Sequence, residues 1–251
     1  MRLLIDLGNS RLKWALADDD DALRLGEPLA HTDSGLADLA QLLAAAGAVQ
    51  SVWLTSTAHS LTGALVDALV RAGLPTPSVF SSPKQALGLR SAYDQPETLG
   101  RDRFLGMIGA RSIYDGPLML ADAGTALTVD VVDADGQHLG GLIVPGPVLM
   151  REALHRGTAG VRAGAVVRLH ELARNTDDAV WSGGCLACIA LIERTHRQAT
   201  LGIGEHVELI LTGGAMPALV GHIDVPYRLL DDIVLRGLNV WSRSVLSQAR
   251  P

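Results

Sequence analysis

Apolar and polar positions along the chain predict strands and helices in alternation. Short apolar stretches bounded by turn residues indicate buried strands, and longer stretches with apolar residues three and four positions apart indicate helices. The predicted strands are 2–7, 12–16, 49–55, 75–80, 117–121, 127–133, 138–143 and 207–212. The predicted helices are 36–46, 61–72, 105–114, 148–155, 179–197 and 231–246. Such alternation is typical of α/β proteins, and hairpins combined with crossovers predict mixed sheets.

One part of this pattern occurs twice. The segments 4–10 (LIDLGNS) and 120–126 (LADAGTA) each carry an apolar strand into an Asp-x-Gly-polar turn. Each turn offers a carboxylate, then a glycine that lets backbone N–H groups approach a phosphate, then a side chain that can donate to it. Two such turns facing one another would hold a polyphosphate and its metal. The repeat predicts a two-lobed nucleotide-binding kinase with domains 1–115 and 116–251, the helix 231–246 closing the second.

Composition narrows the possible partners. The chain has 251 residues, 48% of them hydrophobic, and a formal net charge of −6. An acidic balance argues against a nucleic-acid partner, because domains that bind nucleic acid usually carry a basic face. An aspartate follows Met1 too closely for a signal peptide, and no apolar run approaches the roughly 18 residues of a membrane span. We therefore expect a cytoplasmic protein with small-molecule substrates, no nucleic acid and no membrane.

The two cysteines, Cys185 and Cys188, lie three residues apart on a predicted helix. A zinc site would need two further ligands, and no histidine pair stands at metal-binding spacing. The alternatives are a redox or metal motif and the packing of two small apolar residues on one helix face, which is favoured. The eight histidines are scattered singly, which predicts surface or cap residues.

The first Asp-x-Gly turn contains groups that suit a phosphate and its metal. Asp6 offers an oxygen to Mg²⁺ or to its waters, and Gly8 allows close backbone approach. Asn9 and Ser10 can donate to phosphate, and Lys13 brings a positive charge. The alternative is an ordinary hairpin turn with an exposed lysine.

The second turn repeats the arrangement. Thr125 can donate to phosphates and Asp122 can bind a cation; a capped strand end is the alternative. Farther along, Gly213 and Gly214 follow the strand 207–212, where they would let an adenosine lie against the backbone or simply form a strand-to-helix turn.

Asp102 is the best candidate for a general base. Arg101 and Arg103 flank it, and their charges would lower its pKa and keep it ionised. Phosphoryl transfer needs little covalent chemistry from the protein beyond a carboxylate that receives the hydroxyl proton and cations that hold the phosphates. The alternative is a helix N-cap aspartate in a surface ion pair.

The order of these motifs resembles type III pantothenate kinase, a family that includes proteins named Bvg accessory factor. The resemblance runs from residue 2 to residue 214 through the motifs 6–13, 100–103, 122–126, 140–146 and 175–176. It implies two tandem ribonuclease-H-like lobes with mixed sheets, the α/β fold of the acetate and sugar kinase, heat-shock chaperone and actin superfamily.

The resemblance also implies the reaction. ATP and pantothenate would give ADP and 4′-phosphopantothenate, the first step of coenzyme A biosynthesis, with Mg²⁺ and a monovalent cation, K⁺ or NH₄⁺. Family members are homodimers whose substrate pocket is completed across the interface, so the resemblance implies that Thr176 acts on the neighbouring subunit's site.

Site roles follow residue by residue from the same resemblance. Asp102 would accept the proton, and Asp122 would bind the monovalent cation. ATP would be bound by Asp6, Leu7, Gly8, Asn9, Ser10, Arg11, Leu12, Lys13 and Thr125. Pantothenate would be bound by Tyr93, Gly100, Arg101, Asp102, Arg103 and Thr176. Two departures are small: Ser10 replaces the family's usual threonine, and Arg101 makes the pocket rim more basic, which suits the pantothenate carboxylate.

Other functions fit parts of the sequence. A non-catalytic regulatory relative would keep the fold and lose catalytic residues, which here are intact. A kinase acting on another small alcohol would share every phosphate-binding feature. A metal-dependent nuclease on a ribonuclease-H-like fold is least favoured, because two glycine turns and an acidic chain suit ATP better than a polynucleotide.

Overall fold

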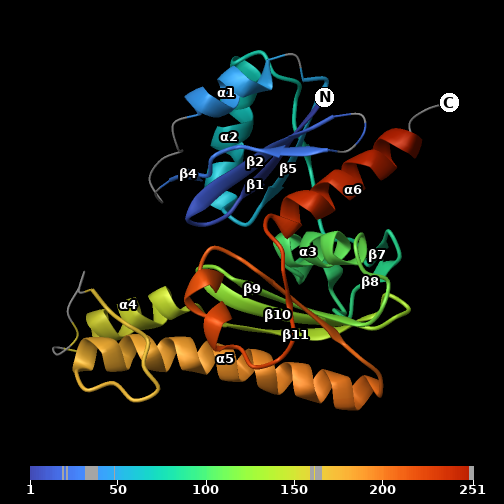
Figure 1. Cartoon of the computed structure of the whole chain (residues 1–251). Helices are drawn as coiled ribbons and strands as arrows, with labels where there is room; N and C mark the ends of the chain where they lie inside the picture. The colour runs from blue at the N-terminus through green and yellow to red at the C-terminus, as the bar shows by residue number, and fades with distance from the viewer. Residues whose placement is uncertain are drawn as a thin grey trace. The chain divides into compact units, whose positions relative to one another are not determined.

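Two mixed sheets organise the chain in the computed structural model (Figure 1), which describes residues 1–18, 20, 22–31, 39–47, 49–158, 161 and 166–248. Each sheet belongs to its own compact unit. The first unit comprises Met1–Asp115 together with Asp232–Pro251, and the second comprises Gly116–Asp231. Among the described residues, no helix has both the length and the apolar character of a membrane span.

The sheet of the first unit has the order β3-β2-β1-β5-β6, and β4 also pairs with β2. The central strand β1 runs antiparallel to β2 and parallel to β5. The strands are β1 (Arg2–Leu7), β2 (Arg11–Ala17), β3 (Leu23–Leu25), β4 (Leu29–Ala30), β5 (Ser51–Ser56) and β6 (Ser78–Val79), with a separate small hairpin of β7 (Gln85–Ala86) and β8 (Leu89–Arg90).

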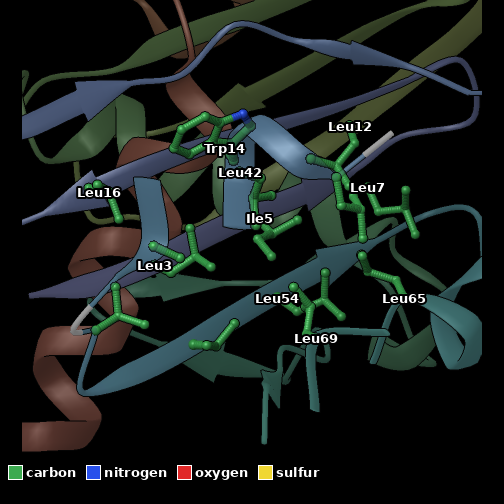
Figure 2. Packing of buried hydrophobic residues seen from close by; sticks show 14 of the residues in the cluster. Leu3, Ile5, Leu7, Leu12, Trp14, Leu16, Leu42, Leu54, Leu65 and Leu69 are labelled. Atoms are coloured by element: carbon green, nitrogen blue, oxygen red, sulfur yellow. The ribbon is translucent and has the colours of Figure 1, made fainter. Parts of the chain in front are cut away.

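Period-two alternation divides this sheet into an apolar face and a mixed face. Leu3, Ile5 and Leu7 of β1 point to one side, where they join buried residues of helices α1 (Ala40–Ala46) and α2 (His59–Arg71) in one core (Figure 2). The opposite face packs against α3 (Arg101–Arg111) and α6 (Ile233–Gln248). There Trp241 of α6 contacts Trp53 of β5 edge-on, with ring centroids 5.1 Å apart.

Helices α3 and α6 approach each other closely through glycine. A Cβ atom at Gly237 of α6 would collide with the Leu105 carbonyl of α3, and one at Gly109 of α3 would collide with the Ile233 carbonyl of α6. Both glycines are buried. This contact joins the C-terminal helix to the first unit.

The second unit repeats the arrangement of its central strands. The sheet order is β11-β10-β9-β12-β13, with β9 antiparallel to β10 and parallel to β12, as β1 is to β2 and β5. Cys185, Cys188 and Ile192 of the long helix α5 pack against the apolar face of this sheet. The elements of this unit are β9 (Leu118–Ala123), β10 (Ala126–Val132), β11 (His138–Pro145), β12 (Glu208–Thr212), β13 (Arg228–Leu229), α4 (Pro147–Gly157), α5 (Thr176–Ile203) and the 3₁₀ turns Met216–Ala218 and Val220–His222. A further 3₁₀ turn, Pro96–Thr98, precedes α3 in the first unit.

The sequence-based elements mostly match these strands and helices. The first compact unit ends at Asp115 and resumes at Asp232, so the helix predicted over 231–246 packs in that unit. That helix carries Trp241 and the glycine contact to α3, and both partners lie in the first unit. For the predicted helix 36–46, the structure has Ala40–Ala46, and residues 36–38 lie outside the described residues.

The glycine contact can be tested by adding one methyl group. We expect Gly237→Ala to lower the free energy of unfolding by about 1–3 kcal/mol, because the new Cβ forces the two helices apart. Urea denaturation measures this change. Gly63→Ala in α2 is the matched control: nothing lies within 4 Å of its Cβ position, and alanine favours a helix over glycine. Equal midpoints for both variants would show that the helices do not need the glycine.

Candidate functional site

The tip of the β1–β2 hairpin forms the first candidate phosphate loop. The strand β1 ends at Leu7, and the Gly8 N–H donates to the carbonyl of Arg11 at 3.0 Å, which closes a tight turn. Asn9 and Ser10 at the tip are exposed. Their polar groups therefore face solvent, where a phosphate can reach them.

A residue that the sequence analysis did not identify supports this tip. Nε2 of His31 lies 2.7 Å from the Gly8 carbonyl oxygen, and since a carbonyl only accepts, the ring nitrogen donates. The backbone N–H of His31 also donates to the Ser10 carbonyl at 3.5 Å. His31 follows β4, which pairs with β2. No spacing in the sequence indicates the contact between His31 and Gly8, because it depends on the pairing of the two-residue strand β4 with β2.

The carboxylate of the first loop lies in a polar row across three strands. Asp6 of β1 stands opposite Lys13 of β2 and opposite Thr55 of β5. Side chains of directly paired residues point to the same side of a sheet. The three side chains therefore share the face opposite the apolar core of Ile5 and Leu7.

Lys13 has a partner that the sequence did not suggest. Its Nζ lies 3.4 Å from Oδ1 of Asp232, at the start of α6, and the two side chains are 32% and 20% exposed. Partly exposed ion pairs of this kind contribute about 0–1 kcal/mol. Lys13 can therefore exchange this carboxylate for phosphate oxygens at little cost.

The second candidate loop has the same construction. Asp122 of β9 stands opposite Thr128 of β10 and Thr212 of β12. The carbonyl of Thr125 accepts from the Gly146 N–H at 2.8 Å, which fastens the turn to the segment before α4. Gly213 has a φ of +104°, and a Cβ there would collide with the Asp122 carboxylate. The glycines after β12 thus serve a turn that passes against this carboxylate.

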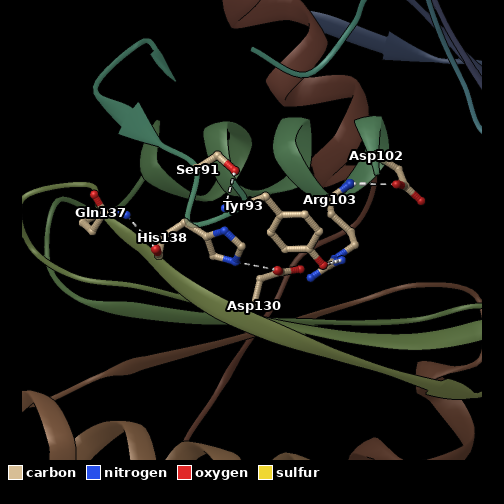
Figure 3. A network of polar contacts seen from close by, with 7 residues as sticks. All are labelled: Ser91, Tyr93, Asp102, Arg103, Asp130, Gln137 and His138. Atoms are coloured by element: carbon tan, nitrogen blue, oxygen red, sulfur yellow. Dashed lines mark hydrogen bonds and ion pairs between the residues drawn. The ribbon is translucent and has the colours of Figure 1, made fainter. Parts of the chain in front are cut away.

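Except for Thr176, the residues assigned to pantothenate by resemblance lie at or near the N-terminus of α3, and Figure 3 shows Tyr93, Asp102 and Arg103 there. Asp102 lies in the first helical turn, and its Oδ1 accepts from the Arg103 N–H at 2.8 Å. Arg103 is buried, and its Nη1 donates to the Tyr93 hydroxyl at 2.9 Å, with the guanidinium 5.6 Å from the Tyr93 ring centroid. The helix N-cap is Gly100. Asp102 is therefore not the N-cap residue that the alternative interpretation required.

Thr176 lies in the second unit, at the first position of α5. The N-cap residue Asn175 accepts from the Asp178 N–H at 2.9 Å. The N–H of Arg168 donates to Asp178 at 2.8 Å, and this bond and the Asn175 amide hold the pKa of Asp178 below its usual value. Thr176 lines an open groove of about 510 Å³ between α4 and α5, together with Met150, Leu154, Ala179, Val180, Gly183 and Gly184.

One histidine is not the surface residue that the sequence predicted. His138 of β11 is fully buried, and its Nε2 lies 2.9 Å from Oδ1 of the equally buried Asp130 on β10 (Figure 3). Asp130 alternates with Val129 and Val131, which belong to the α5 core, so the pair lies on the other face of the second sheet. A single histidine carries no periodic signal, and only strand pairing reveals its partner.

The cysteines follow the packing interpretation. Both are buried in the core of the second unit, and burial raises the pKa of the Cys185 and Cys188 thiols to about 11. Within the part of the chain that the structure describes, no three His, Cys, Asp or Glu side chains gather to hold a metal. The Cys-x-x-Cys spacing thus reflects one face of α5.

The fold and the paired carboxylate turns define a class of protein. Two units with the same central strand order make an α/β protein with ribonuclease-H-like units, the architecture of sugar kinases, heat-shock chaperones and actin. Solved structures agree on the fold. A Baf family transcriptional activator from Campylobacter jejuni aligns with a TM-score of 0.61 and 21% identity, over 98% of this chain and 99% of that one. An activator of 2-hydroxyisocaproyl-CoA dehydratase from Clostridium difficile aligns with a TM-score of 0.54 and 10% identity, over 100% and 98%.

The family follows from sequence. A family model described as type III pantothenate kinase matches residues 2–198. The type III pantothenate kinase of Aromatoleum aromaticum is 37% identical over 243 residues, covering 97% of this chain and 98% of the relative. That of Burkholderia mallei is 38% identical over 261 residues, covering 97% and 100%. The chain belongs to the type III pantothenate kinase family.

Thiol labelling tests the packing role of the cysteines. At neutral pH a thiol with a pKa near 11 is ionised roughly 100-fold less than an ordinary cysteine, and burial slows its reaction further. We expect iodoacetamide to leave both thiols of the folded protein unmodified while labelling both in urea. Rapid labelling of the folded protein would restore the redox or metal interpretation.

Proposed function

We propose that the chain transfers the γ-phosphoryl group of ATP to the hydroxyl of pantothenate, giving ADP and 4′-phosphopantothenate, the first step of coenzyme A biosynthesis. The family supports the reaction. The observation that carries the assignment of the site is the gathering of Tyr93, Asp102 and Arg103 at the start of α3. The alternative of a non-catalytic relative has no comparable support, because each of these groups is present.

Asp102 is the proposed proton acceptor. The Arg103 N–H fixes the orientation of its carboxylate, and the buried guanidinium of Arg103 is held in turn by Tyr93. An acceptor already oriented when the substrate arrives needs no rearrangement during the reaction. Gly100, Arg101 and Arg103 would line the pantothenate site, where the arginines suit its carboxylate.

Each of the two glycine turns carries groups proposed to bind ATP phosphates. The N–H and side-chain donors of Asn9 and Ser10, the Lys13 ammonium and the Thr125 hydroxyl are the groups offered to them. The segment Asp6–Lys13 has the local shape for this role, since the Gly8 N–H closes a tight turn and His31 hydrogen-bonds its tip.

The donor sets suit the two cations that the family implies. Asp6 presents a hard carboxylate oxygen at a strand end beside exposed oxygen donors, which matches a Mg²⁺ ion that keeps several waters. Asp122 is paired with threonines of two neighbouring strands, and its carboxylate and their hydroxyls are oxygen ligands that suit K⁺ or NH₄⁺. When bound, these cations would neutralise the charge that spreads over the phosphoryl oxygens.

A homodimer is also proposed, with Thr176 completing the pocket of the neighbouring subunit. The groove of about 510 Å³ between α4 and α5 supports it, because Thr176 lies beside the apolar side chains of Met150, Leu154 and Val180 there. We propose that the reaction takes place in the cytoplasm, where the co-substrate ATP is present.

Turnover with different cations tests the reaction. We expect ADP release from ATP and Mg²⁺ to depend on pantothenate and to need K⁺ or NH₄⁺, with little turnover when Na⁺ is the only monovalent cation. Enzyme-coupled ADP detection measures it. Turnover with another small alcohol and none with pantothenate would contradict the substrate, and equal rates in Na⁺ would contradict the role of Asp122.

The role of Asp102 is tested separately. We expect Asp102→Asn to retain ATP and pantothenate binding by calorimetry and to lose about 10²- to 10⁴-fold in kcat, the usual contribution of a general base. Glu97→Gln, an exposed carboxylate in the preceding 3₁₀ turn, is the control and should leave kcat unchanged. An undiminished kcat in Asp102→Asn would rule the residue out as the proton acceptor.

A further inference from the structure

The hydroxyl of Thr55 is buried without a hydrogen bond. Its side chain is 0% exposed, and its Oγ1 has no partner among the residues that the structure describes. The adjacent Ser56 is also buried, but its hydroxyl pairs with Thr62 at 2.8 Å. Buried polar groups are nearly always paired, and leaving one unpaired destabilises the fold. An unpaired hydroxyl at this position therefore needs an explanation.

Strand pairing places this hydroxyl beside the carboxylate of the first loop. Thr55 is the direct partner of Asp6 across the parallel β1–β5 pair, where strands lie about 4.8 Å apart. Leu54, its neighbour along β5, belongs to the apolar core on the other face. The hydroxyl therefore lies on the face that carries Asp6 and Lys13.

The second unit repeats the feature. Thr212 is the direct partner of Asp122 across the parallel β9–β12 pair, and it is also buried. Each sheet thus sets a buried threonine beside the carboxylate that ends its central strand. Valine has nearly the same shape and would fit a dry site without an unpaired hydroxyl, so packing alone does not account for threonine at position 55.

We propose that Thr55 is a positioning residue for the Asp6 end of the ATP site, and that its hydroxyl hydrogen-bonds a water of the Mg²⁺ hydration shell when Mg·ATP binds. Mg²⁺ loses its waters reluctantly and is bound largely through them, so the acceptors around that shell orient the ion. The hydroxyl is unpaired in the ligand-free protein and paired in the complex. This proposal rests on the proposed function, since it requires Mg·ATP at Asp6.

Opposite effects on stability and on binding distinguish this role from a structural one. Thr55→Val removes only the hydroxyl. We expect it to raise the urea midpoint of the ligand-free protein, because an unpaired buried hydroxyl is replaced by a methyl group. We also expect it to raise the dissociation constant of Mg·ADP, measured by calorimetry, about 3- to 10-fold, which is the effect of losing one hydrogen bond. The affinity for ADP in the presence of EDTA should not change. Thr55→Ser keeps the hydroxyl and should bind Mg·ADP as the unchanged protein does.

Ser56→Ala is the matched control one residue along the strand. Its hydroxyl is paired, so the substitution should lower the urea midpoint and leave the Mg²⁺ dependence of ADP binding intact. A Thr55→Val variant that is less stable, or that binds Mg·ADP as tightly as the unchanged protein, would overturn the proposal for Thr55. The proposed kinase function would still stand in that case, provided that the unchanged protein binds ADP in a Mg²⁺-dependent way. If the unchanged protein bound ADP with no help from Mg²⁺, the magnesium role of Asp6 would fall and this proposal with it.

Discussion

The alternation of side chains across the two central strands is the constraint on which the rest of the molecule depends. One face of β1 must carry leucine and isoleucine into the core, so the remaining positions of the strand have to point the other way. The carboxylate of Asp6, near the end of that strand, therefore lies on the face opposite the core, and strand pairing places Lys13 and Thr55 beside it. The strand β9 obeys the same rule with Asp122.

Local sequence patterns were sufficient to predict most strands, both glycine turns and the existence of α3, because each depends on residues only a few positions apart; the start of α3, at Arg101 and not at residue 105, was not predicted. The polar face of the first sheet also follows from alternation. The residues that could not be predicted are those whose partners are distant along the chain. His31 reaches Gly8 through a two-residue strand, and Asp232 reaches Lys13 from the start of α6. Nothing in the amphipathic pattern of the last helix indicates which sheet it covers.

Stability and function make different demands on the same row of side chains. A sheet selected only for stability would place apolar residues or paired hydroxyls beside Asp6, and Ser56 with Thr62 illustrates the paired solution nearby. Two groups of the row, Lys13 and Thr55, contribute little to the ligand-free fold: the Lys13 ion pair is partly exposed, and the Thr55 hydroxyl is unpaired. Such groups are available to a ligand because the fold does not depend on them.

The return of α6 to the first unit has a consequence for synthesis on the ribosome. Residues 116–231 form an uninterrupted unit, whereas the unit begun by strands β1 and β2 lacks α6 until residues 233–248 have been synthesised. Trp53 and the glycine surface of α3 remain uncovered throughout that interval. The nascent chain therefore keeps part of the apolar surface of the first unit exposed while the second unit is synthesised, and a chaperone would have reason to bind there.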